Sequence, residues 1–331
     1  MKAVALISGG LDSALAAKVV MEQGIEVYGF TVVHIFSESI KTATSSYAER
    51  SADELGITLH SHKSSQDFLN IVKHPKYGYG RNMNPCLDCR IYMLIKAGQY
   101  MKKIGASFLI TGEVLGERPM SQRRDAMNIT DRDSGLKGLI LRPLSARLLS
   151  PTVPEIKGWI SRDILFDIQG RSRKPQLMLA NQYGIQEFSA PAGGCLLTEP
   201  NFSKRMKDLM KFKPDFTLKN VELLKIARHF RLPSGAKVII GRNEQENNKL
   251  LKLCRDNMLR LEPQDVAGPV VLVESETNGE DIRTAALLCA MYCKKTATWQ
   301  NINVFKKDHP RIIRIREGEH VSDKNITDWR I

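Results

Sequence analysis

The stretch "KAVALISGGLDSALAAKVVMEQG", residues 2–24, decides the fold of the first part of this chain. Residues 2–8 form an apolar run of strand length. In residues 14–24 the apolar positions recur at helical spacing, and Gly24 is typical of a helix end. The two glycines between these segments mark a turn. The stretch therefore predicts a strand, a glycine-containing loop and a helix.

The same alternation continues toward residue 113. Apolar runs predict strands over 26–36, 57–62 and 107–113, and helical periodicity predicts helices over 45–56 and 89–106. Strands that alternate with helices form a doubly wound parallel sheet covered on both faces, so the fold class is α/β. Ligands of such sheets bind at the carboxyl ends of the strands.

The pattern changes near residue 200, and we predict two domains, 1–200 and 201–331. The second is expected to be a smaller α/β domain. Its helices are predicted over 202–212, 220–230, 244–254 and 280–295, and its strands over 236–242, 269–275, 302–307 and 311–317.

Composition describes an ordinary folded protein, with 331 residues, 42% hydrophobic and 26% charged. No apolar run has membrane-spanning length and no leader is apparent, so we expect a cytoplasmic protein with no membrane partner. The net charge is +13, and residues 201–331, with 25 basic and 17 acidic side chains, hold +8 of it. This excess favours a polyanionic partner such as nucleic acid, although a solvated basic face is the alternative.

The loop "SGGLDS", residues 8–13, has the composition of a phosphate site. Gly9 and Gly10 let backbone N–H groups approach an anion, Ser8 and Ser13 add hydroxyl donors, and a helix N-terminus follows. The loop contains neither the GxxxxGK[ST] pattern nor the GxGxxG pattern.

The whole string SGGLDS after the first strand resembles the PP-loop ATP pyrophosphatases. The resemblance implies that ATP is cleaved to AMP and pyrophosphate while a substrate carbonyl oxygen is adenylated. Ser8, Gly9, Gly10, Asp12 and Ser13 would then hold the pyrophosphate. Asp12 would lie near Mg²⁺ and take part in catalysis.

Three further segments resemble the tRNA 4-thiouridine synthetases: "TGEVLGERPMSQRRDAMN" at 111–128, "LILRPL" at 139–144 and "APAGGCLLT" at 190–198. The resemblance implies tRNA as a partner and Cys195 as the sulfur-bearing residue. It also implies nucleotide contacts by Phe30, Arg90, Gly112 and Gln122.

The cysteine pair in "NPCLDCR", residues 84–90, resembles the NPCxxCN segment of the 2-thiouridine synthetases. A CxxC with one distant cysteine also resembles cluster-dependent tRNA thiolation enzymes. Cys86, Cys89 and Cys195 would then be catalytic and hold three irons of a [4Fe–4S] cluster, whose fourth iron could bind hydrosulfide. Two alternatives are a persulfide on Cys195 with Cys86 and Cys89 as resolving thiols, and zinc binding or packing alone.

The segment "SGAKVIIGRNEQENNKLLKL", residues 234–253, resembles the NFACT-R type of RNA-binding domain. Arg242, with Lys237, Lys249 and Lys252, could contact RNA phosphates or form a solvated face. The synthetases usually place a THUMP domain before the ATPase, and some add a rhodanese domain. Because this sequence begins at the phosphate loop, we expect the second domain to hold the tRNA, and sulfide or a sulfur-donor protein to supply sulfur.

We therefore expect an ATP- and Mg²⁺-dependent tRNA sulfurtransferase that forms 4-thiouridine. One alternative is 2-thiouridine formation. Another is a non-catalytic RNA-binding protein with a vestigial phosphate loop. A small-molecule ligase is disfavoured by the net charge.

Overall fold

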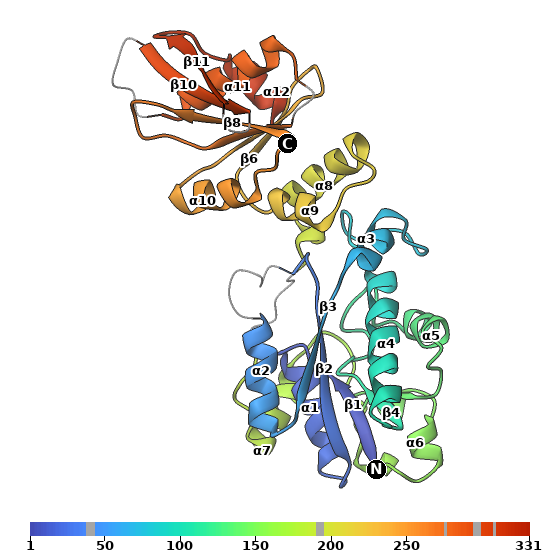
Figure 1. Cartoon of the computed structure of the whole chain (residues 1–331). Helices are drawn as coiled ribbons and strands as arrows, with labels where there is room; N and C mark the ends of the chain where they lie inside the picture. The colour runs from blue at the N-terminus through green and yellow to red at the C-terminus, as the bar shows by residue number, and fades with distance from the viewer. Residues whose placement is uncertain (38–43, 190–194, 275–276, 294–298, 307–308) are drawn as a thin grey trace. The chain divides into compact units, whose positions relative to one another are not determined.

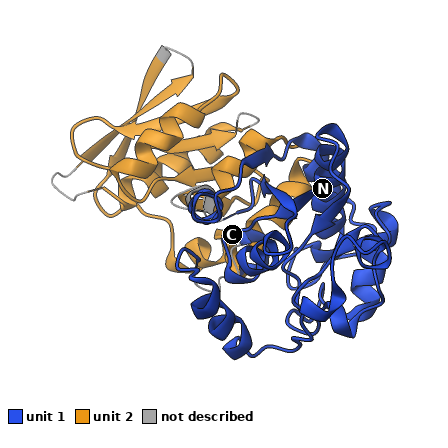
Figure 2. Ribbon diagram, turned by 90° about the horizontal axis from the view of Figure 1, so that it is seen from below, with its two compact units in different colours: residues 1–199 blue, residues 200–331 orange. Residues whose placement is uncertain are grey.

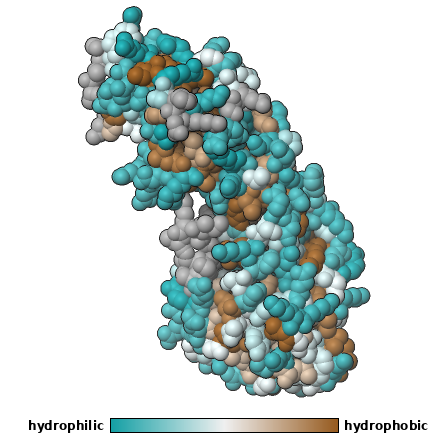
Figure 3. All heavy atoms as spheres, in the orientation of Figure 1, coloured by the Kyte–Doolittle hydropathy of each residue, from teal (hydrophilic) through white to brown (hydrophobic). Residues whose placement is uncertain are grey.

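The chain forms two compact units, Met1–Glu199 and Pro200–Ile331, coloured separately in Figure 2. The computed structural model describes residues 1–37, 44–189, 195–274, 277–293, 299–306 and 309–331. Within these ranges, no helix combines the length and apolar character needed to cross a membrane. The face shown in Figure 3 is mostly hydrophilic, with hydrophobic residues in small separate groups.

The first unit is built on a parallel sheet of strand order β3-β2-β1-β4-β5. Its strands are β1 (Lys2–Leu6), β2 (Glu26–Val33), β3 (Leu59–Lys63), β4 (Phe108–Ile110) and β5 (Ile140–Leu141). The predicted doubly wound parallel sheet is confirmed. Because β1 pairs with both β2 and β4, the chain reverses its winding direction beside β1, and the carboxyl ends of β1 and β4 open toward one crevice.

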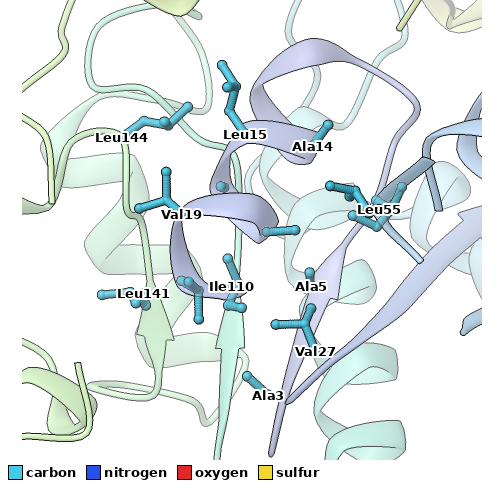
Figure 4. Packing of buried hydrophobic residues seen from close by; sticks show 14 of the residues in the cluster. Ala3, Ala5, Ala14, Leu15, Val19, Val27, Leu55, Ile110, Leu141 and Leu144 are labelled. Carbon is cyan, nitrogen blue, oxygen red and sulfur yellow. The ribbon is translucent and has the colours of Figure 1, made fainter. Parts of the chain in front are cut away.

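Helices cover both faces of this sheet (Figure 1). They are α1 (Leu11–Met21), α2 (Thr44–Leu55), α3 (Gln66–Lys73), α4 (Cys86–Lys103), α5 (Arg124–Asp133), α6 (Val153–Ile156) and α7 (Lys174–Tyr183). Side chains alternate along each strand. Ala3 and Ala5 of β1 therefore pack with α1 in one core cluster, shown in Figure 4, while Val4 and Leu6 pack with α4 in another.

Helix α4 begins at Cys86, three residues before the predicted start at Cys89. Its first turn is held by Asp88, whose carboxylate accepts hydrogen bonds from the backbone N–H groups of Lys76 and Tyr77 at 2.9 and 3.1 Å. Both cysteines of the CxxC pair therefore lie in the first turn of a helix. Helices α3, α5, α6 and α7 were not predicted.

The second unit contains a six-stranded antiparallel sheet of order β11-β10-β8-β9-β7-β6. The strands are β6 (Arg228–Arg231), β7 (Lys237–Ile240), β8 (Met258–Pro263), β9 (Val271–Glu274), β10 (Trp299–Lys306) and β11 (His309–Arg316). The helices are α8 (Pro200–Phe212), α9 (Leu218–Leu224), α10 (Glu244–Leu253), α11 (Gly279–Met291) and α12 (Asp323–Trp329).

The single helix predicted over 220–230 is wrong in its second half. Helix α9 ends at Leu224, and Arg228–Arg231 pairs with β7 as an edge strand. Between them Ala227 takes a positive φ of 70°, a conformation that ends a right-handed helix. Strand β8 was also missed. Both segments are strands because they pair with distant segments, which local periodicity does not report.

Candidate active site

The predicted phosphate loop lies between β1 and α1, at the carboxyl edge of the sheet. Ser13 Oγ donates to the carbonyl oxygen of Gly10 at 2.7 Å and lies 3.2 Å from Ser8 Oγ, and the N–H of Gly10 reaches Ser8 Oγ at 3.3 Å. Among the residues whose positions are described, no side chain caps the N-terminus of α1. The loop thus presents hydroxyl groups and an uncapped helix end, which together suit an anion.

Gly9 is required by the packing of this loop. Its φ is +78°, and a Cβ atom there would lie 2.7 to 2.8 Å from atoms of Tyr47 and Ala48. A side chain would clash with α2 in addition to straining the backbone.

Asp12, in the first turn of α1, is surrounded by arginine side chains from distant segments. Burial raises the pKa of its carboxyl group, while the positive charges of Arg173 and Arg118 oppose that rise. Asp12 Oδ1 is buried and accepts no hydrogen bond from the described residues. An unpartnered carboxylate oxygen beside a phosphate loop fits a hydrated Mg²⁺ brought by a nucleotide.

Gly112, directly after Thr111 at the end of β4, touches the phosphate loop from behind. A Cβ atom on Gly112 would lie 2.4 Å from the carbonyl carbon and oxygen of Asp12 and 2.5 Å from the backbone nitrogen of Ser13. The absence of a side chain therefore lets β4 meet the start of α1. The nucleotide contact assigned to Gly112 stays a prediction.

Gln122 is buried and closes the loop that follows β4. Its Oε1 accepts from the backbone N–H of Arg118 at 3.1 Å, and its carbonyl oxygen accepts from Gly116 at 2.7 Å. These bonds fix the stretch that carries Arg118. Contact between Gln122 and a nucleotide stays a prediction.

Arg90 lies in a buried ion network centred on Glu113. Arg90 Nε and Arg142 Nε lie 2.8 and 2.9 Å from the two carboxylate oxygens of Glu113, and Arg142 also pairs with Asp131 at 2.6 Å. Burial by itself would raise the pKa of Glu113, but the two arginines outweigh it and hold that pKa at about 2. The network ties α4 to the ends of β4 and β5.

Phe30 is a core residue in the middle of β2. Its ring centroid lies 5.7 Å from that of His60 and 5.5 Å from that of Tyr100, and the side chain is 2% exposed. Packing accounts for this environment, and the predicted nucleotide contact is untested.

Cys195 approaches the CxxC pair through backbone pairing. It forms a bridge with Ser37 just beyond β2, and the next residue, Leu196, donates to the carbonyl of Phe36 at 2.9 Å. On the other side, the N–H of Met83 donates to the carbonyl of Leu197 at 3.1 Å. The segment after Cys195 therefore lies between the end of β2 and the turn that leads into the CxxC helix.

The thiol of Cys89 lies among these groups in a partly buried residue. Burial, reinforced by the neighbouring Cys195 and Cys86, raises its pKa to about 12. Cys89 is therefore a neutral thiol at physiological pH. Burial also raises the pKa of Cys86, against the nearby charge of Arg118.

The segment that leads to Cys195 starts at the phosphate loop. The N–H of Ser189 donates to the carbonyl of Gly9 at 2.8 Å, and Ser189 bridges Gly10. Residues 190–194, which carry most of the predicted APAGGC motif, lie outside the described residues. The two ends of this segment link the phosphate loop to the cysteines.

The cysteines were tested as a ligand set for a cluster. Among the residues with described positions, no three or more His, Cys, Asp or Glu side chains are arranged to hold a metal ion. The raised pKa of Cys89 describes the thiol without a metal, and a bound metal would remove its proton. The described geometry thus contains no ready-made ligand set, and the cluster stays a prediction.

Three residues of this site were missed from the sequence: Arg118, Arg173 and Gln176. Their charges or polar groups surround Asp12. The available signal was the basic run "GRSRK", residues 170–174, immediately before an apolar helix. No local rule connects that run to a loop 160 residues earlier.

Two family models match this chain. Residues 1–147 match the family described as Thiamine biosynthesis protein (ThiI), and residues 227–330 match the NFACT protein RNA binding domain. The first unit is therefore similar to the ThiI family, and the second to the NFACT type of RNA-binding domain. The predicted resemblances to both are confirmed.

Curated relatives of the ThiI-like chain include tRNA-specific 2-thiouridylase MnmA of Pseudomonas fluorescens (strain SBW25). It is 26% identical over 238 residues, which cover 68% of this chain and 60% of the relative. MnmA of Caldicellulosiruptor saccharolyticus is 27% identical over 220 residues, covering 61% and 58%. The chain spans about 60% of the length of these relatives.

Among solved structures, a 4-thiouridine synthetase in complex with RNA and bound ATP is similar to the chain. It shares 20% identity at a TM-score of 0.34, and the match covers 68% of this chain and 52% of that one.

Proposed function

We propose that this chain is an ATP-dependent tRNA sulfurtransferase that adenylates a uridine carbonyl oxygen and exchanges that oxygen for sulfur. This proposal rests on one observation: the phosphate loop and the cysteine-bearing segments lie at the same edge of the sheet. The phosphate loop and the segment after Cys195 are joined through Ser189, and that segment pairs with the residues before the CxxC helix.

The residues of the first unit suit such a reaction. The uncapped N-terminus of α1 and the hydroxyls of Ser8 and Ser13 would bind phosphate oxygens, and Arg118 and Arg173 would balance their charge. A bound Mg²⁺ would neutralise charge on the leaving pyrophosphate. The uridine oxygen would then leave with AMP when a sulfur nucleophile adds to the same carbon.

The second unit offers an arginine cluster for the RNA backbone. Arg205 on α8 lies near Arg242 and Arg330, and their positive charges, after burial, lower its pKa. The cluster lies beside edge strand β6, because Arg330 bridges Phe230 and Arg228 Nη1 contacts the carbonyl of Gly241 at 3.4 Å. Positive charges held together in this way favour phosphate contacts.

Lys237, named from the sequence as a possible RNA contact, has a different environment. It is 4% exposed and its Nζ lies 2.6 Å from Asp208 Oδ2. The Lys237 side chain is held in an interior ion pair, so Lys237 is not part of the proposed RNA surface.

For the product we propose 4-thiouridine, supported by the resemblance of residues 111–128, 139–144 and 190–198 to the tRNA 4-thiouridine synthetases. The second candidate is 2-thiouridine, favoured by the curated MnmA relatives. Mass analysis of tRNA nucleosides from cells without the protein separates them: loss of 4-thiouridine supports the first, and loss of 2-thiouridine the second.

The sulfur route is a separate question. The three-cysteine [4Fe–4S] cluster stays a prediction from resemblance, and anaerobic purification with iron and sulfide analysis tests it. Iron-free protein with full activity would leave the persulfide route through Cys195. The cluster route would take hydrosulfide, whereas the persulfide route would take sulfane sulfur from a sulfur-donor protein, with Cys86 and Cys89 as the thiols that reduce the persulfide on release.

The enzymatic proposal itself is tested by pyrophosphate release from ATP in the presence of tRNA. Release that depends on tRNA supports it, and release without tRNA would point to a small-molecule substrate. Protein that binds tRNA but never releases pyrophosphate would instead be a non-catalytic RNA-binding protein.

A further inference from the structure

Gln176 is a buried amide whose polar neighbour among the described residues is the carboxyl group of Asp12. It is the third residue of α7 and has no exposed surface. Burial raises the pKa of the Asp12 carboxyl group and the amide of Gln176 opposes that rise, but neither Nε2 nor Oε1 makes a hydrogen bond of normal geometry with the described residues. Native proteins rarely leave both ends of an interior amide unpaired, because each end loses its hydrogen bonds to water.

This amide lies beside the phosphate loop. Asp12 is the second residue of α1, its Oδ1 is also buried and unpartnered, and the amide of Gln176 adjoins its carboxyl group. Leu179 and Ala180 of α7 belong to the same core cluster as Leu15 and Val19 of α1. Helix α7 therefore packs on α1, and the interaction of Gln176 with Asp12 joins their first turns.

The unsatisfied groups are complementary to a hydrated cation. Asp12 Oδ1 is an acceptor, while Gln176 offers two N–H donors and one acceptor. Apolar packing explains none of these groups, because Leu or Met would fill the same space without burying polar atoms. A ligand with protons to donate and positive charge to balance Asp12 satisfies them.

We propose that Gln176 is a positioning residue for the divalent cation of a nucleoside triphosphate held at residues 8–13. Its N–H group orients the Asp12 carboxylate, and its carbonyl oxygen accepts a hydrogen bond from the water shell of the cation. Groups that orient a metal ligand in this way change metal affinity by about 10- to 100-fold when removed. The inference rests on the proposed nucleotide site.

The test measures binding of a non-hydrolysable ATP analogue to the full chain, with Mn²⁺ and in EDTA. In wild type, Mn²⁺ is expected to raise the affinity for the analogue. In Gln176→Leu this increase is expected to be about tenfold smaller, while the affinity in EDTA stays unchanged. Gln182→Leu, the same change at an exposed position of α7, is the matched control and is expected to match wild type. Circular dichroism checks that each variant is folded.

Gln176→Glu provides a second variant of nearly the same shape. Its added negative charge should enlarge the increase in analogue affinity that Mn²⁺ causes, and should weaken analogue binding in EDTA. An unchanged gain in both Gln176 variants would overturn the inference while leaving nucleotide binding intact. Wild-type protein that binds no analogue under either condition would instead remove the proposed function.

Discussion

The backbone of Gly112, directly beyond β4, lies against the backbone of Asp12 in the first turn of α1, with no room for a Cβ atom between them. This contact joins the two strand ends that flank the crevice of the sheet. A residue 100 positions later in the chain therefore supports the phosphate loop by direct backbone contact.

Gly112→Ala is expected to destabilise the first unit. The new Cβ would overlap backbone atoms at 2.4 Å, and α1 would have to shift. Overpacking of this kind costs about 1–3 kcal/mol. Urea unfolding measures the loss, with Gly279→Ala as the control, because a Cβ there meets nothing within 4 Å. Equal stability of both variants would contradict the tight contact.

Glu113→Gln is expected to lower the free energy of unfolding by about 3–5 kcal/mol, because it leaves buried Arg90 and Arg142 without their shared carboxylate. Glu26→Gln, at an exposed carboxylate 3.8 Å from Lys2, is expected to change stability little. Urea unfolding at neutral pH compares the two variants with wild type, and similar effects would contradict the buried network.

The same carboxylate predicts a pH dependence. The pKa of Glu113 is held at about 2 in the folded protein, against an ordinary value of 4.5. Its stabilisation is therefore complete above pH 4.5 and is lost as pH falls toward 2. Unfolding free energies measured across this interval should fall less steeply in Glu113→Gln than in wild type. Parallel curves would show that Glu113 titrates normally.

Cys89 is expected to resist alkylation in the folded protein. Burial raises its pKa to about 12, so its thiolate fraction at pH 8 is roughly a thousandfold below that of a thiol with the ordinary pKa of 9. Iodoacetamide labelling followed by peptide mass analysis measures the rate. The same residue in urea serves as the control, and equal rates in both states would mean that the thiol is open to solvent.

Arg242→Ala and Arg330→Ala are each expected to weaken tRNA binding and to reduce the slope of log affinity against log salt by about 1. Removing one phosphate contact releases one fewer counterion. Arg283→Ala is the matched control, because Arg283 pairs with Glu319 as Arg242 pairs with Glu246, but lies outside the arginine cluster. Salt slopes that stay at the wild-type value would exclude these arginines from the RNA surface.

The sequence by itself determined the parallel sheet, the phosphate loop and the two resemblances. These features depend on contiguous residues, namely apolar runs separated by turn residues and the unbroken string SGGLDS. The CxxC pair was equally visible, although the helix that carries it starts three residues earlier than its periodicity suggested.

Tertiary structure alone decided what surrounds those motifs. Arg173 and Gln176 reach Asp12 because α7 packs on α1, and Cys195 reaches the turn before Cys86 because Leu196 and Leu197 pair with Phe36 and Met83. Strand β6 likewise exists through its pairing with β7. Such contacts join residues far apart in the chain, and their free energy comes from burial and pairing that no local pattern records.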